Sequence, residues 1–251
     1  MPLDIARIRS LRGQNQIHYF ASTGSTMTEA THLASSGAPH GVVVLADEQT
    51  AGIGRLGHSW YSEAELGIYC SIVLRLALRP ACLPVASLLL GLATADAIQQ
   101  STSLACDLRW PNDVLIEERK VAGVLPHLVD GCIVAGIGIN VNQTSFADGL
   151  RTPATSLRLA SGGRLYAREI IVVNLLESID ALCATLASDG PEAILKAFST
   201  LSSYAIDRRV VIEENGSRGI TAGLDENGFL LVRSESGRIE KLAAGGVRPD
   251  R

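Results

Sequence analysis

The chain has 251 residues, a net charge of −4 and 47% hydrophobic residues, which excludes global disorder and allows one large domain or a medium and a small one. The net negative charge and the low aromatic content of 4% both disfavour a dedicated nucleic-acid binder. The five cysteines and five histidines lack metal-ligand spacing, so we expect reduced, buried thiols and no structural metal site. No apolar targeting segment opens the chain, and the uncharged run 83–95 is too short for a bilayer, so we expect a cytoplasmic protein.

The first half of the chain alternates strand and helix patterns. The expected elements are a strand at 17–20, a helix at 27–35, a buried strand at 42–46, a strand at 67–76 and an apolar helix at 83–100. Thr26 and Glu29 fit a capping box at the start of the first helix.

The second half begins with a predicted antiparallel meander. Its strands are expected at 108–116, 120–129 and 132–141, with connections at 117–119 and at Asp130-Gly131. A loop is expected at 144–163, followed by helices at 167–187 and 191–201. The short strand patterns after Ile206 indicate a small barrel or sandwich, with strands at 210–212, 219–222, 229–232 and 239–242.

A glycine-rich loop at 52–57 follows a buried strand and matches the pattern G-x-G-x-x-G. A dinucleotide-binding interpretation requires a helix directly after the loop, and the residues after Gly57 have no helical periodicity. The antiparallel meander further along the chain also disfavours a parallel sheet. The loop is therefore either a plain connection or an anion-binding loop in which Arg55 adds a phosphate-matching cation.

The segment from Arg109 to Asp113 contains Pro111 inside a strand pattern, which predicts a bulge, an edge position or an ordinary turn. In a hairpin closed at 117–119, Asp113 and Lys120 are expected to lie nearly opposite each other. This pair is either an ordinary cross-strand contact or a device that holds a lysine for chemistry on anions. Gly138, inside the last meander strand, predicts close approach of another group or a tight packing contact.

In this order the motifs resemble those of class I biotin–protein ligases, over almost the whole chain. The corresponding segments are Ser25-Thr26, 49–60, 109–113, 120–123 and 138–140. Four positions depart from the family pattern. Two loop arginines are replaced by Ile53 and His58, the lysine before Trp110 by Arg109, and the asparagine after Ser-Thr by Met27.

The resemblance implies an α+β fold with a mixed or antiparallel central sheet flanked by helices, as in the class II synthetase-like biotin/lipoate ligases. It also implies a catalytic domain at 1–205 and a C-terminal SH3-like β domain at 206–251. The implied reaction has two steps. Biotin and ATP, with Mg²⁺, form biotinyl-5'-AMP, and the biotinyl group then passes to a lysine of a biotin carboxyl carrier protein domain of a carboxylase.

The resemblance also implies site residues. Lys120 and Arg55 would stabilise the phosphates, and Asp113 would orient Lys120 or assist the acceptor amine. Biotin would meet Ser25, Thr26, Met27, Gln49, Gly52, Ile53, Gly54, Arg55, Lys120 and Gly123. ATP or the adenylate would meet Arg55, Trp60, Asn112 and Asn140. Metal ligands are not specified.

Three alternatives stay open or are disfavoured. A lipoate or octanoate ligase shares the fold, although the apolar surroundings of most cysteines disfavour a thioester mechanism. A non-catalytic biotin sensor is consistent with Ile53 and His58. A helix-turn-helix repressor is disfavoured, because only 24 residues precede Ser25. We therefore expect no nucleic-acid or membrane partner, and a homodimer is left open.

Overall fold

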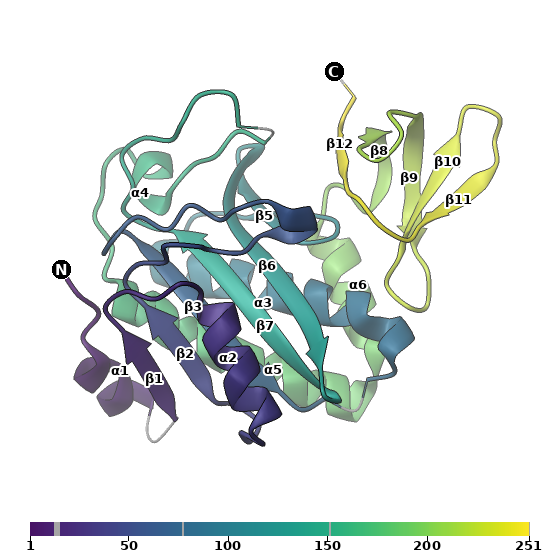
Figure 1. The fold of residues 1–251 in the computed structure, drawn as a ribbon. Coiled ribbons are helices and arrows are strands. Elements are labelled where there is room, and N and C mark those ends of the chain that lie inside the picture. The colour runs from purple at the N-terminus through teal and green to yellow at the C-terminus, as the bar shows by residue number, and fades with distance from the viewer. Residues whose placement is uncertain (13–15, 77, 151, 251) are drawn as a thin grey trace.

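A seven-stranded mixed sheet, with strand order β1-β2-β3-β7-β6-β5-β4, forms the centre of the larger part of the molecule (Figure 1). The computed structural model describes residues 1–12, 16–76, 78–150 and 152–250. Only β1 and β2 pair in parallel, and all other neighbours are antiparallel. The strands are β1 (Ile17–Phe20), β2 (Val43–Ala46), β3 (Gly67–Leu74), β4 (Asp107–Arg109), β5 (Asp113–Ile116), β6 (Arg119–Val129) and β7 (Cys132–Asn140).

Helices cover both faces of this sheet (Figure 1). The α-helices of the described residues are α1 (Ile5–Arg12), α2 (Thr26–Ser35), α3 (Leu83–Thr102), α4 (Leu157–Ala160), α5 (Arg168–Asp189) and α6 (Pro191–Leu201), of which α2 packs on one face and α3 and α5 on the other. Successive strand residues point to opposite faces, so Val43 and Leu45 join the core under α3 and α5, whereas Val44 packs with α2. Burial on both faces explains why β2, β3 and β7 are nearly continuous apolar runs.

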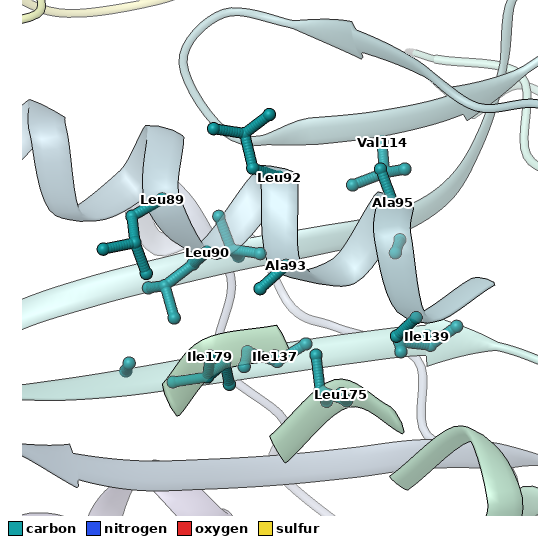
Figure 2. Close-up of a cluster of buried hydrophobic side chains, with 14 of the residues drawn as sticks. Leu89, Leu90, Leu92, Ala93, Ala95, Val114, Ile137, Ile139, Leu175 and Ile179 are labelled. Carbon is teal, nitrogen blue, oxygen red and sulfur yellow. The ribbon is translucent and has the colours of Figure 1, made fainter. Parts of the chain in front are cut away.

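The main core lies between the sheet, α3 and α5. Figure 2 shows Leu90 and Ala93 of α3 near Ile137 of β7 and Leu175 and Ile179 of α5. Helix α5 is the one described helix that is long and apolar enough to cross a membrane by length and composition. Its inward face, including Leu175 and Ile179, is buried in this core.

A second, five-stranded antiparallel sheet occupies the C-terminal part, with strand order β11-β10-β9-β8-β12. Its strands are β8 (Ile206–Ile212), β9 (Arg218–Leu224), β10 (Leu230–Ser234), β11 (Ile239–Leu242) and β12 (Val247–Pro249). This sheet matches the predicted small β domain. The indole N–H of Trp110 donates to Gly228 O at 3.0 Å and ties the turn before β10 to the larger part.

Several elements differ from the sequence prediction. The predicted strand 108–116 is two strands, β4 and β5, because the chain reverses at the cis Trp110–Pro111 bond. The pattern analysis missed α1, β12 and the short helix α4 inside the predicted loop 144–163. The cap of α2 is Ser25, not Thr26, since Ser25 Oγ accepts the N–H of Met27. The Thr26 side chain is thereby available for other contacts.

Candidate functional site

A cavity of about 50 Å³ lies between α2, β6, β7 and the glycine-rich loop. It adjoins a cleft of about 440 Å³, and both are lined by Gly54, Arg55, Trp60, Asn112 and Lys120. A small cavity that continues into a wider cleft suits one compact ligand placed end to end with a larger one.

The inner end of the cavity is polar. Thr26 donates through its backbone N–H and its hydroxyl to Gln49 Oε1, at 2.9 and 3.0 Å. Gln49 Nε2 donates to Ser62 Oγ at 2.8 Å, and Thr26 Oγ1 lies 2.8 Å from Ser71 Oγ. Each side chain is thus held in one orientation, which fixes the donors and acceptors that a ligand would meet.

Paired glycines form the floor of the cavity. Gly123 and Gly138 face each other across β6 and β7, and the Trp60 ring lies over both. A Cβ at Gly138 would come within 2.4 Å of the ring, and one at Gly136 within 2.6 Å of Met27 Sδ. The Trp60 ring thus packs tightly on Gly138, which agrees with both alternatives predicted for this glycine, close approach of another group and a tight packing contact. Trp60 Nε1 is buried and has no hydrogen-bond partner among the described residues.

Lys120 lies at the junction of the cavity and the cleft, with its ammonium held by Asp113. Nζ is 2.6 Å from Asp113 Oδ1, and Arg109 Nη2 is 2.6 Å from Oδ2. Burial raises the pKa of Asp113, but the Lys120 and Arg109 cations outweigh this and hold the pKa below its usual range. Asp113 is therefore an ionised carboxylate that positions Lys120.

The register between β5 and β6 corrects one expectation. Asp113 pairs with Gly123, and Lys120 pairs with Leu115, so Asp113 and Lys120 are not opposite each other. The register shifts between Val114 and Leu115, and the two side chains meet diagonally.

The glycine-rich loop folds back on itself. Gly54 N donates to His58 O at 2.7 Å, so this N–H is not presented to an anion as the loop pattern suggested. Arg55 Nη1 donates to Asn112 Oδ1 at 3.2 Å and to Gly245 O at 2.9 Å. Arg55 thus connects the loop to the β4–β5 turn and to the segment before β12.

Most of the sequence-predicted site residues lie together. The cavity is lined by Thr26, Met27, Gln49, Ile53, Gly54, Arg55, Trp60, Asn112, Lys120 and Gly123. The cleft is lined by Asp113 and Asn140 in addition to the shared residues. Ser25 and Gly52 line neither: Ser25 caps α2, and Gly52 O accepts the Trp60 N–H at 2.8 Å.

Sequence reasoning missed several lining residues. Phe146 and Leu150, in the loop after β7, and Glu213, after β8, border the cleft. They belong to no motif, and only the tertiary fold brings them to the site. Cys70 and Gly136 line the cavity, and the apolar strand patterns around them carry no signal of that role.

The described residues contain no group of three or more His, Cys, Asp or Glu side chains arranged to hold a metal ion. The carboxylates that line the described cleft are Asp113 and Glu213. Mg²⁺ commonly binds through one or two carboxylates together with substrate phosphates. Both oxygens of Asp113 already contact cations, Oδ1 with Lys120 and Oδ2 with Arg109, so a Mg²⁺ ion in this cleft would be held mainly by the phosphates of a substrate.

Comparison with known proteins gives consistent matches. The model of the biotin/lipoate A/B protein ligase family matches residues 19–143. A "Biotin--[acetyl-CoA-carboxylase] ligase" of Mycobacterium tuberculosis is 33% identical over 247 residues, covering 94% of this chain and 89% of that protein. A "Bifunctional ligase/repressor BirA" of Bacillus spizizenii is 32% identical, covering 94% and 74%. The solved structure "Biotin protein ligase from Aquifex aeolicus in complex with biotin and ATP" has a TM-score of 0.80 and 29% identity, covering 94% and 98%.

Proposed function

Because the chain belongs to the biotin/lipoate A/B protein ligase family, we propose that it is an ATP-dependent biotin–protein ligase. The observation that carries the proposal is the placement of Lys120. Its ammonium is held by Asp113 where the cavity meets the cleft, beneath the loop that contains Arg55. A carboxylate in the cavity and a triphosphate in the cleft would meet at this cation.

The first step joins two anions. A biotin carboxylate oxygen attacks the α-phosphorus of ATP, the bond to the bridging oxygen breaks, and pyrophosphate leaves. Lys120 would stabilise the charge that develops on the α-phosphate oxygens, where a fixed cation is most effective. Arg55 would hold the loop over the mixed anhydride and limit access of water. Mg²⁺ enters as part of the MgATP substrate.

The ligand positions follow from the polarity of the walls. The ureido head of biotin carries two N–H donors and one carbonyl acceptor, which suit the polar end formed by Thr26 and Gln49. The apolar tail would run over Gly123 and beside Trp60. The nucleotide would occupy the cleft near Asn112 and Asn140.

The proposed acceptor is a lysine of a biotin carboxyl carrier protein domain of a carboxylase. Two relatives whose names specify a ligase for acetyl-CoA carboxylase support this choice. We further propose a cytoplasmic location, and a division into a catalytic domain at 1–205 and an SH3-like domain at 206–251. The repressor activity in the names of the Bacillus relatives is not part of the proposal.

A lipoate or octanoate ligase is the second candidate, because the name of the family includes lipoate ligases. A thioester mechanism would need a reactive thiol, and Cys70 is the cysteine that lines the described cavity. Burial raises the pKa of Cys70 to about 12, so the thiol is neutral near pH 7 and a poor nucleophile. The cavity chemistry therefore favours the adenylate route.

Isotope exchange between pyrophosphate and ATP tests the proposal directly. We expect exchange that depends on biotin and on Mg²⁺, with little stimulation by lipoate or octanoate. Exchange stimulated by lipoate and not by biotin would assign the enzyme to the second candidate. Tight biotin binding without any exchange would make the protein a sensor.

A further inference from the structure

Arg109, on β4, is a buried cation beside the Asp113–Lys120 pair, and it is not among the residues that line the described cavity or cleft. Its side chain is 6% exposed. Nη2 donates to Asp113 Oδ2 at 2.6 Å and to Thr152 Oγ1 at 2.8 Å. The two oxygens of one carboxylate are therefore divided, with Oδ2 held by Arg109 and Oδ1 held by Lys120.

The surroundings fix the guanidinium of Arg109 in this position. It lies 6.0 Å from the centre of the Tyr204 ring, and Arg208 packs over the same ring at 4.9 Å. The Tyr204 hydroxyl donates to Glu118, which also forms an ion pair with Arg208. A buried charge is retained only when it is paired and hydrogen-bonded, and here the pairing is directed at Asp113.

Arg109 also reaches the backbone next to Lys120 through Thr152. Lys120 N donates to Pro153 O at 2.8 Å, and Thr155 N donates to Lys120 O at 2.9 Å. The segment that begins at Thr152 thus pairs with β6 at Lys120 itself. Arg109 Nη2 therefore constrains two groups that position Lys120. One is the Asp113 carboxylate, which holds the Lys120 ammonium, and the other is the segment from Thr152, which pairs with the Lys120 backbone.

We propose that Arg109 is a positioning residue for adenylate formation, which fixes Asp113 Oδ2 and thereby keeps Oδ1 against Lys120 Nζ at the junction of cavity and cleft. The inference rests on the proposed function. Without Arg109, the Asp113 carboxyl can rotate about its terminal torsion, which is broad. Lys120 would then lose its fixed position relative to the α-phosphate, although it would still be present.

Two substitutions separate this role from simple packing. Arg109→Met keeps an unbranched apolar stem and removes the charge and the donors. Arg109→Lys keeps a cation that can donate to Asp113, and lysine stands at this place in the motif that the sequence resembles. Arg12→Met is a matched control, because Arg12 is also 6% exposed and pairs with Asp180 on α5, outside the described cavity and cleft.

The measurement is biotin-dependent ATP–pyrophosphate exchange, with kcat and KM determined separately for biotin and MgATP. We expect Arg109→Met to lower kcat by about 100-fold with KM changed by less than about threefold, because misplacement by about 1 Å has such an effect. Arg109→Lys should recover kcat to within about tenfold of the wild type, and Arg12→Met should leave kcat unchanged.

The outcomes separate this inference from the proposed function. A wild-type protein without exchange would overturn the proposed function. If the wild type is active and the kcat of Arg109→Met lies within about twofold of the wild-type value, the inference about Arg109 is overturned and the proposed function stands. The inference is also overturned if Arg109→Met folds and the kcat of Arg109→Lys is no higher than that of Arg109→Met. If near-UV circular dichroism shows that Arg109→Met does not fold, Arg109→Leu, which also lacks side-chain donors, replaces it under the same criteria.

Discussion

Lys120 Nζ lies 2.6 Å from Asp113 Oδ1, although the backbone ladder pairs neither residue with the other. The shift in register between Val114 and Leu115 brings the two side chains together diagonally. This contact places a lysine ammonium where the narrow cavity opens into the cleft. The proposed stabilisation of the α-phosphate depends on this contact.

Lys120→Met should abolish adenylate formation and leave the fold intact. The Lys120 side chain is 24% exposed, so its loss exposes little core. We expect biotin-dependent exchange to fall by at least about 100-fold, because removal of one electrostatic stabiliser of a transition state has that effect. Rapid-quench measurement of biotinyl-5'-AMP checks the result. Wild-type rates in this variant would remove Lys120 from the mechanism.

Asp113→Asn should lower stability in a pH-dependent way. The pKa of Asp113 is lowered on folding, so the ionised carboxylate stabilises the protein above its unfolded pKa, near 3.8. That contribution is lost as the pH falls through the still lower folded value. At neutral pH we expect a loss of about 3 kcal/mol in unfolding free energy, since the buried Arg109 and the partly exposed Lys120 lose their counter-ion.

Urea unfolding at neutral pH and below about pH 4 measures this difference, which should shrink in acid. Asp250→Asn is the control, because its partner Arg218 is 65% exposed. We expect that variant to lose less than about 1 kcal/mol. A pH-independent loss in Asp113→Asn would contradict an ionised Asp113.

Gly138→Ala should weaken biotin binding by displacing Trp60. The added Cβ would come within 2.4 Å of the Trp60 ring, and such contacts do not occur in real structures. Gly91→Ala is the control, because a Cβ there meets only Leu108 Cδ2, at 3.6 Å. Alanine inside a helix stabilises by roughly 0.5–1 kcal/mol relative to glycine. Calorimetric biotin titration checks both variants, and equal affinities would show that the floor tolerates a methyl group.

Arg55→Gly should release the glycine-rich loop from Asn112 and from Gly245. We expect biotinyl-5'-AMP to form and to escape into solution, because the loop no longer covers the adenylate. Chromatography of the filtrate after rapid ultrafiltration measures the escaped adenylate. If the variant retains both its adenylate and its full activity, Arg55 has only a structural role.

Turn and helix-start residues in the sequence correctly predicted the elements that depend on neighbouring residues alone. The Asp130-Gly131 turn closes β6 and β7 as expected, because both residues have positive φ. Pro191 begins α6, which spans the predicted residues. Pro111 marked a break in the strand pattern 108–116 and allowed an ordinary turn there, and the structure shows that the chain reverses at this point so that β4 pairs back on β5.

The site was predictable where its residues occur in ordered motifs, as for Thr26, Gln49 and Lys120. The role of Arg109 was not, because it arises from contacts with Asp113 and Thr152 that only the tertiary structure forms. The cleft residues Phe146 and Leu150 were missed for the same reason. Spacing along the chain predicted the β5–β6 hairpin but not its register, and it does not indicate which distant loop covers the hairpin.

The most direct test of the central claim uses the purified protein with MgATP, biotin and a biotin carboxyl carrier protein domain. Intact mass spectrometry of the carrier domain is the readout. We predict a gain of one biotinyl group on its acceptor lysine, absent when ATP is omitted and absent with Lys120→Met. A carrier domain that stays unmodified here, while a biotin–protein ligase of established activity modifies it, would contradict the account.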